Sequence, residues 1–209
     1  MRHLKKIIVV LSIYLILIAF FLFSPDSIMN ADKSLFLWIN SLYSNFANYY
    51  FFAITFIGSS IFWLALIILF WFGGKKDVSI RLLYVFILDS IFLLFLKYGF
   101  VRPRPTQDFQ NFLIDYDLGP SFPSGHTQRA FSGMMVLGSY FSKIGGWLFL
   151  LSCLVGLSRI YLGFHYPLDV LVGLMNGIIT GYAVMFWPTK HIKKAVKNFY
   201  KTIRKLIRR

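Results

Sequence analysis

Two histidines and a carboxylate stand out in a chain that is otherwise mostly apolar, because together they could move a phosphoryl group. His126 ends the short segment PSGH, and His165 precedes Asp169 by four residues in the segment HYPLD. An imidazole that a carboxylate orients can act as a nucleophile, and a second imidazole can protonate a leaving oxygen and then activate water. We therefore expect His165 to be the nucleophile, Asp169 to orient it and His126 to be the general acid.

Three cations and one turn could bind the phosphoryl group. Lys97, Arg104 and Arg159 each lie at or near the end of an apolar run, where they could clamp a phosphate. Ser124 adds a hydroxyl donor, and Gly125 allows the backbone to approach a ligand closely. Because Gly125 stands just before an expected helix start, free N–H groups there would also favour an anion.

Taken singly, these residues have ordinary structural explanations. With Pro167 at the first position of a helix, Asp169 falls at the third, where carboxylates commonly cap. Lys97 and Arg159 could extend from membrane helices toward the interface, and His165 could be an interfacial aromatic residue. Their combination at one membrane depth favours a functional site, since charges inside spans are costly and usually functional.

The composition of the chain predicts a polytopic membrane protein. Of the 209 residues, 57% are hydrophobic and only 14% are charged, whereas soluble domains carry roughly 25% charged residues. Several apolar runs reach the roughly 17–25 residues that cross a bilayer as a helix. We expect an all-α protein with six transmembrane helices, at about residues 7–23, 49–72, 78–100, 126–141, 147–163 and 167–187.

The distribution of basic residues predicts how these spans are oriented. Six spans place both termini on one side, and the basic N-terminus, the loop GGKKD and the basic C-terminus mark that side as cytoplasmic. Lys97, Arg102, Arg104 and Arg159 fall near the opposite face, against this bias. We interpret the exception as an anion site that faces the outside of the inner (cytoplasmic) membrane.

The C-terminal tail is basic and amphipathic. Residues 190–209 hold nine of the 22 Lys and Arg residues, and their apolar residues recur every three or four positions. This pattern is typical of a helix on an anionic leaflet, and we favour it over nucleic-acid binding. The chain therefore divides into a membrane domain, 1–189, and a cytoplasmic tail, 190–209, that contacts anionic lipid head groups. The single Cys153 can form no intrachain disulfide.

Three spaced motifs resemble those of a known family. Residues 97–105 match K-x6-R-P, residues 123–126 match P-S-G-H, and residues 158–169 match S-R-x5-H-x3-D. Their order and spacing are similar to those of the type 2 phosphatidic acid phosphatase (PAP2) superfamily, and the resemblance covers about residues 30–187.

The resemblance to the PAP2 superfamily implies a six-helix bundle and phosphatase chemistry through a phosphohistidine, without a metal or another cofactor. It implies the catalytic roles given above for the two histidines and the carboxylate. It also implies a phosphoryl-binding set of Lys97, Arg104, Ser124, Gly125 and Arg159. Soluble vanadium haloperoxidases share the motif but lack membrane spans, which disfavours that branch.

A site at the lipid–water boundary predicts a membrane lipid phosphate as substrate. Arg129 lies three residues after His126 and could contact a second phosphate, or it could pair with Asp115 or Asp117. Asp89, within the third span, could be the partner of a site cation or a contact between helices. We hypothesise a polyprenyl diphosphate of the undecaprenyl type, with phosphatidylglycerol phosphate, phosphatidic acid and a lipid A phosphate as alternatives.

Two other classes of protein remain open from the sequence. A non-enzymatic membrane tether would use the basic tail to recruit a partner or an anionic lipid, but it would not need the three motifs. A transporter would place charges across the bilayer, whereas these charges gather at one face. No obligate protein partner is implied, since one chain supplies every motif residue.

Overall fold

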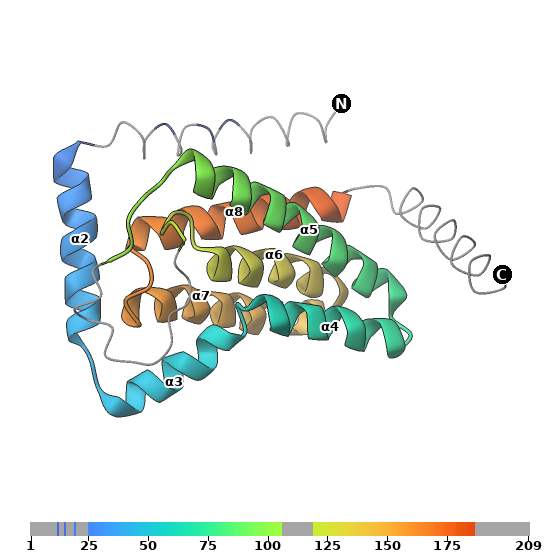
Figure 1. Cartoon of the computed structure of the whole chain (residues 1–209). Coiled ribbons are helices and arrows are strands. Elements are labelled where there is room, and N and C mark those ends of the chain that lie inside the picture. The colour runs from blue at the N-terminus through green and yellow to red at the C-terminus, as the bar shows by residue number, and fades with distance from the viewer. Residues whose placement is uncertain (1–11, 13–14, 16–18, 20–24, 106–118, 187–209) are drawn as a thin grey trace, which may run out of the picture.

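The described part of the chain is a bundle of helices (Figure 1). The computed structural model describes residues 25–105 and 119–186, together with positions 12, 15 and 19. In these ranges every regular element is a helix, in agreement with the expected all-α class. The order is α2 (Asp26–Ser41), α3 (Asn45–Phe56), α4 (Ser60–Phe72), α5 (Lys76–Gly99), α6 (Gly125–Tyr140), the 3₁₀ helix η2 (Ser142–Ile144), α7 (Gly145–Tyr161) and α8 (Pro167–Phe186). Apart from the three single positions, the predicted first span and the predicted tail lie outside the described residues.

Three helical segments are long and apolar enough to cross a membrane. Lys76–Gly99, Ser142–Tyr161 and Pro167–Met185 correspond to the predicted third, fifth and sixth spans. At about 1.5 Å per residue they reach roughly 28–36 Å, which matches a hydrocarbon core of about 30 Å. The predicted fourth span corresponds to α6, which has only 16 residues. The structure therefore supports a membrane protein without confirming the predicted number of six spans.

The predicted second span is not one continuous helix. The structure has α3 and α4 there, bent by 49° at a short break, and the pair is apolar enough to form one broken span. The Ser59 hydroxyl accepts a hydrogen bond from the backbone N–H of Phe62 at 3.2 Å and so caps the start of α4. A Cβ at Gly58 would lie 2.8 Å from the Cβ of His126, so the break packs directly against the start of α6.

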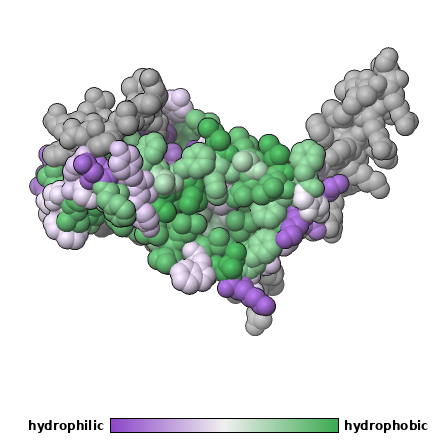
Figure 2. Space-filling model, turned by 90° about the horizontal axis from the view of Figure 1, so that it is seen from below, coloured by the Kyte–Doolittle hydropathy of each residue, from purple (hydrophilic) through white to green (hydrophobic). Residues whose placement is uncertain are grey.

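The outer surface of the described bundle is apolar. On α4 and α5 the large exposed side chains include Ile61, Ile68, Leu69, Ile91 and Phe95. Figure 2 shows hydrophobic residues across the middle of one face and hydrophilic residues toward its two ends. Soluble proteins rarely expose apolar patches of this extent. This surface fits a protein whose middle is surrounded by lipid.

Helices α6 and α8 approach each other closely because three glycines of α8 lie on the side that faces α6. Gly173, Gly177 and Gly181 recur every four residues along it. A Cβ at Gly173 would lie 2.5 Å from the carbonyl oxygen of Ser124, and one at Gly181 would lie 2.6 Å from the Cβ of Met135. Small residues let membrane helices pack backbone to backbone. The close approach holds α8 along α6, and a hydrogen bond from the Ser124 N–H to the carbonyl oxygen of Asp169 at 3.0 Å joins their first turns, where motif residues lie.

Asp89 joins α5, α6 and α8 in the interior of the bundle. Its carboxylate accepts hydrogen bonds from the amide of Gln128 at 3.0 Å, from the hydroxyl of Thr180 at 2.6 Å and from the hydroxyl of Ser132. The residue is only 2% exposed. Of the two roles that the sequence left open, these bonds show the contact between helices. In a low-dielectric interior such a network is stable only while its donors keep their acceptor.

Replacing Asp89 by alanine should destabilise the bundle. One amide hydrogen of Gln128 would lose its acceptor. The hydroxyls of Ser132 and Thr180 would each lose the shortest of their hydrogen bonds. A buried donor left without a partner costs about 1–3 kcal/mol, so the thermal midpoint in detergent should fall by several degrees. Asp89→Asn keeps one acceptor oxygen, so its thermal midpoint should fall less. Ser90→Ala, at the neighbouring position, serves as the control. Equal midpoints for all three variants would contradict this role of Asp89.

Candidate active site

The residues of the three motifs meet at one end of the bundle, beside α2. The segments that converge there are residues 100–105 after α5, residues 119–124 before α6, the turn between α7 and α8, and the first turn of α8 (Figure 1). The charges of Arg104 and Arg159 both act on His126, and they act on His165 as well. These side chains therefore lie within electrostatic reach of one another, although they are far apart in the sequence.

A turn after α7 directs His165 into this site. Gly163 has a φ of +79°, a left-handed conformation that commonly ends helices and that favours glycine. The backbone N–H groups of Phe164 and His165 both donate to the carbonyl oxygen of Arg159, at 3.0 and 3.1 Å. The turn thus folds His165 back toward Arg159, and Pro167 then begins α8, a position where proline is favoured.

The Nδ1 edge of the His165 ring lies near two oxygen atoms. The side chain is 1% exposed, and its Nδ1 lies 3.7 Å from Oδ2 of Asp169 and 3.5 Å from the hydroxyl of Ser121. This arrangement favours a proton on Nδ1 and a lone pair on Nε2. Burial lowers the pKa of His165 to about 4, which outweighs the opposing effect of Asp169. At neutral pH the ring is therefore uncharged, which is the form that a nucleophile needs.

Asp169 is fully buried and accepts several hydrogen bonds. Its Oδ2 accepts from the backbone N–H of Tyr166 at 2.9 Å, and also from the hydroxyl of Ser121. The contact with Tyr166 is the cap that the sequence offered as the ordinary explanation. The other oxygen, Oδ1, accepts from Arg102 Nη1 at 2.6 Å. Asp169 thus caps α8 and also lies beside His165. Its role as a helix cap therefore does not rule out a role in orienting the histidine.

Two of the predicted phosphate-binding cations are held by backbone carbonyl groups. Lys97 Nζ donates to the carbonyl oxygen of Pro120 at 2.9 Å. Arg104 donates to the carbonyl oxygens of Gly119 and Phe164, at 2.9 and 3.0 Å. These contacts fix the side chains in place without neutralising their charge. Both cations therefore border the segment that leads into α6, and Arg104 also borders the turn that carries His165.

Two further arginines border the site from the side of the α3–α4 break. Arg159 is 4% exposed, donates to the hydroxyl of Thr55 at 3.1 Å, and lies over the ring of Phe164 at 4.0 Å. Arg129 Nη1 lies 3.4 Å from the carbonyl oxygen of Gly58. Its charge also acts on the motif histidine of α6. The structure thus places Arg129 beside the predicted site, whereas its two alternative acidic partners lie outside the described residues.

Ser124 and Gly125 form the start of α6 at the centre of the site. Ser124 is fully buried, and its backbone N–H donates to the carbonyl oxygen of Asp169 at 3.0 Å. A Cβ at Gly125 would lie 2.7 Å from Leu93 Cδ2 and 3.4 Å from Arg129 Nη1. Gly125 is thus required for packing against α5 and beside Arg129. The structure adds this reason to the predicted approach of a ligand to the backbone.

Three residues of the site were not predicted from the sequence. Ser121 and Arg102 contact Asp169 directly, and Asp32 binds the other side of the Arg102 guanidinium at 2.6 Å. The charge pattern had marked Arg102 as a cation on the unexpected side of the membrane, but without a role. Ser121 lies two residues before PSGH and had no chemical signature. Asp32 lies in a different region of the sequence, and no local pattern connects it with Asp169.

The fold and this site define a class of protein: a helical membrane protein with a buried histidine–carboxylate centre among several cations. Residues 79–193 match the PAP2 superfamily, which is more than half of the chain. The chain belongs to the PAP2 superfamily. All three predicted motifs lie in the described residues and converge on this centre.

Relatives and solved structures of the same family differ in the lipid that their names give. Undecaprenyl-diphosphatase BcrC of Bacillus subtilis is 38% identical over 84 residues, a match that covers 40% of this chain and 44% of that protein. The chain thus matches less than half of the length of that relative. Phosphatidylglycerophosphatase B of Bacillus subtilis is 30% identical over 164 residues, which cover 70% of this chain and 75% of that protein. The crystal structure of a transmembrane PAP2 type phosphatidylglycerolphosphate phosphatase from Bacillus subtilis has a TM-score of 0.71 at 27% identity, and the match covers 93% of this chain and 98% of that chain.

Proposed function

We propose that this protein is an integral membrane phosphatase that removes a phosphate from a polyprenyl diphosphate through a phosphohistidine. One observation carries the proposal: His165 is buried and neutral, with Nδ1 toward Asp169 and with Arg104 and Arg159 close enough for their charges to act on it. A lone pair on Nε2 among fixed cations suits attack on a phosphorus atom whose oxygens those cations bind.

The first step forms a covalent intermediate. The Nε2 lone pair of His165 attacks the terminal phosphorus, and the bond from this phosphorus to the bridging oxygen breaks. The anionic diphosphate, once bound among the cations, favours the protonated form of His126. His126 then gives this proton to the departing oxygen, so that the lipid leaves as a monophosphate. Asp169 stabilises the positive charge that develops on the His165 ring during this step.

The second step returns the enzyme to its starting state. His126, now neutral, accepts a proton from a water molecule while the water oxygen attacks the phosphorus. The bond between phosphorus and Nε2 breaks, its electron pair returns to His165, and inorganic phosphate leaves. Lys97, Arg104 and Arg159 bind the phosphoryl oxygens throughout, together with the N–H groups at the start of α6. The proposed chemistry uses side chains of this chain alone.

A diphosphate substrate is supported by the position of Arg129 and by one relative. Arg129 adds a cation beside the first turn of α6, close enough for its charge to act on His126. A second phosphate next to the reacting one would lie beside this cation, which would attract it. The relative named undecaprenyl-diphosphatase is 38% identical over its matched segment. We therefore assign the isoprenoid diphosphate as the preferred substrate.

Arg129→Ala should separate diphosphates from monophosphates. A charge-assisted hydrogen bond contributes about 1.5–3 kcal/mol, so kcat/KM for the diphosphate should fall about tenfold to hundredfold. Turnover of a lipid monophosphate should change far less. Arg81, whose guanidinium binds carbonyl groups of Val184 and Met185 near the end of α8, provides Arg81→Ala as a matched control. Equal losses on both substrates would show that Arg129 does not read a second phosphate.

A phosphatidylglycerol phosphate phosphatase is the second candidate. The structure of that type from Bacillus subtilis covers nearly all of this chain, and the relative of corresponding name covers more of the chain than the diphosphatase does. The reacting group is the same in both cases, so the motif residues would have the same roles. The candidates differ only in what lies beyond the first phosphate.

We infer the orientation of the protein in the membrane from its charges. We place the site at the outer face of the inner membrane and both termini in the cytoplasm, because the cations at the site oppose the bias of the other basic residues. The lipid substrate would then present its head group from outside. Residues 1–189 would form the catalytic membrane domain, and residues 190–209 would bind anionic lipid head groups on the cytoplasmic side.

Phosphate release from defined lipids tests this proposal. The purified full chain in detergent, with EDTA present, would be given a C55 polyprenyl diphosphate, phosphatidylglycerol phosphate and phosphatidic acid in parallel. We expect release from all three, with the highest kcat/KM for the diphosphate. A higher value for phosphatidylglycerol phosphate would support the second candidate. Release from none of them would contradict the phosphatase assignment.

A further inference from the structure

We propose that Asp32 and Arg102 are positioning residues of the active site, which makes α2 a working part of it; this inference rests on the proposed function. Arg102 binds two carboxylates at once. Its Nη1 lies 2.6 Å from Oδ1 of Asp169, and its Nη2 lies 2.6 Å from Oδ2 of Asp32. A single guanidinium thus bridges Asp32 and Asp169. The two carboxylates are far apart in the sequence, since 136 positions separate Asp32 from Leu168, the residue before Asp169.

This chain of charges is shielded from solvent. The side chain of Arg102 is 10% exposed, that of Asp32 is 2% exposed, and that of Asp169 is 0% exposed. Buried ion pairs keep their geometry because losing one partner leaves an uncompensated charge in a medium of low dielectric constant. The guanidinium also lies over the ring of Tyr166 at 4.2 Å. Arg102 is therefore fixed from three sides, and it fixes Asp169 in turn.

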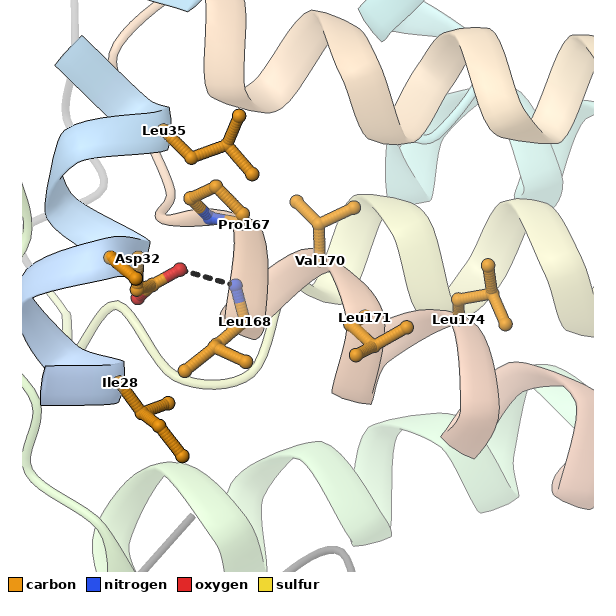
Figure 3. Close-up of a pocket in the computed structure, with 9 residues that line it drawn as sticks. Ile28, Asp32, Leu35, Pro167, Leu168, Val170, Leu171 and Leu174 are labelled. Carbon is orange, nitrogen blue, oxygen red and sulfur yellow. Dashed lines mark hydrogen bonds between the residues drawn. The ribbon is translucent and has the colours of Figure 1, made fainter. Parts of the chain in front are cut away.

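Asp32 also holds the first turn of α8. Its Oδ1 accepts a hydrogen bond from the backbone N–H of Leu168 at 2.9 Å, as Figure 3 shows. Leu168 immediately precedes Asp169 in the chain. The carboxylate of Asp32 therefore acts on Asp169 by two routes, one through the Arg102 side chain and one through the backbone of α8.

The rest of the contact between α2 and α8 is loose and apolar. A groove of about 460 Å³ lies between them, and its lining is made of Ile28, Ala31, Asp32, Leu35, Pro167, Leu168, Val170, Leu171 and Leu174 (Figure 3). Asp32 is the one charged residue among these. Apolar contacts across an open groove do not fix a helix in register, whereas the paired charges do. Asp32 thus fixes α2 against α8, with the rings of Phe36 and Tyr166 in edge-to-face contact beside it. Near the other end of α2, Asn40 donates to the carbonyl oxygen of Tyr161 at 2.9 Å.

Asp32 also balances the charge of Arg102. Arg102 alone would offset the negative charge of Asp169, and His165 would lose the anion that stabilises its charged form. The groups that face His165 are Asp169 from α8, Ser121 from the segment before α6, His126 from α6, Arg159 from α7 and Arg104 from the segment after α5. Two of these are cations, so the negative charge of Asp169 must be preserved. With Asp32 in place, the positive charge of Arg102 is shared between two carboxylates. Arg102 then orients Asp169 without fully offsetting its negative charge.

Asp32→Asn is the test, because asparagine keeps the shape of the side chain and removes its charge. We expect kcat for the lipid diphosphate to fall about tenfold. The inhibition constant of inorganic phosphate should stay unchanged, since the phosphate-binding cations are not altered. Arg102→Gln should lower kcat further, about a hundredfold. The double variant should be no slower than Arg102→Gln, because both residues act through Asp169.

Two controls separate positioning from general damage to the fold. Lys33→Ala removes the exposed neighbour of Asp32 on α2 and should keep the kcat of the wild type. Thermal midpoints in detergent identify variants that do not fold, and Asp32→Glu replaces Asp32→Asn if the latter fails. With the glutamate, the carboxylate is kept but displaced, and kcat should again fall while phosphate inhibition stays unchanged.

The possible outcomes are distinct. If the wild type is active and Asp32→Asn is equally active, Asp32 does not position Asp169. If Asp32→Asn weakens phosphate inhibition as much as it lowers kcat, the effect is a general loosening of the site and the inference is wrong. If the wild type releases no phosphate from any lipid, the proposed function fails, and the inference fails with it.

Discussion

His165→Ala will remove phosphate release from the lipid diphosphate, with a fall in kcat of about 10⁴-fold or more. The expected size follows from the role of the ring, which supplies the electron pair for the covalent intermediate. The surroundings of His165 suit this role, because its Nδ1 faces Asp169 and the charges of two arginines act on the ring. The measurement is single-substrate kinetics of phosphate release in detergent with EDTA.

The control for this variant concerns stability, because His165 is only 1% exposed. His165→Gln keeps a polar side chain of comparable length, and its thermal midpoint should stay close to that of the wild type. It should be as inactive as His165→Ala, since an amide is not a nucleophile for phosphorus. Phosphate release that survives in either folded variant would remove His165 from the mechanism.

Asp169→Asn should lower kcat about 10³- to 10⁴-fold, with a much smaller change in KM. The estimate follows what the loss of the charge behind a catalytic histidine does in other hydrolases. In the variant, an NH₂ group would face either Arg102 on one side or the donors Ser121 and Tyr166 on the other. The carboxamide would also favour the wrong tautomer of His165, with the proton on Nε2.

This variant distinguishes the two roles that Asp169 combines. If Asp169 only capped α8, asparagine could still accept from the N–H of Tyr166, and kcat of the folded variant would fall less than about tenfold. The thermal midpoint would fall in either case, because the buried pair with Arg102 is lost. Steady-state kinetics with the lipid diphosphate separate these results, once the midpoint shows that the variant is folded. A small loss of kcat would leave Asp169 as a helix cap and would contradict its catalytic role.

The sequence predicted the gathering of the motif residues because each motif stands at the end of an apolar run. The ends of spans lie at one of two membrane depths, so charge and hydropathy alone place Lys97, Arg104, His126 and Arg159 near the same face. The expected ends of the fifth and sixth spans left His165 between two helices, and local rules added the cap by Asp169. The PAP2 match at residues 79–193 agrees with this reading of the motifs.

Other features could not be predicted because they depend on packing between distant segments. The break at Gly58 packs against His126, and a hydropathy profile does not register such a contact. The glycine row on α8 was visible in the sequence, but only the structure shows that it faces α6. The pairing of Asp32 with Arg102 requires that α2 lie across the start of α8, and no spacing rule connects the two segments.

The most direct test of the mechanism is to trap the covalent intermediate. A polyprenyl diphosphate labelled in its terminal phosphate would be mixed with the wild type, with His165→Ala and with Lys33→Ala, and the reactions would be quenched with alkali within one turnover. The account predicts a protein-bound label in the wild type and in Lys33→Ala that is stable to base and lost in acid, as expected for a phosphorus–nitrogen bond to imidazole, and no label in His165→Ala. Rapid phosphate release from the wild type without any bound label, or equal labelling of His165→Ala, would contradict the phosphohistidine mechanism.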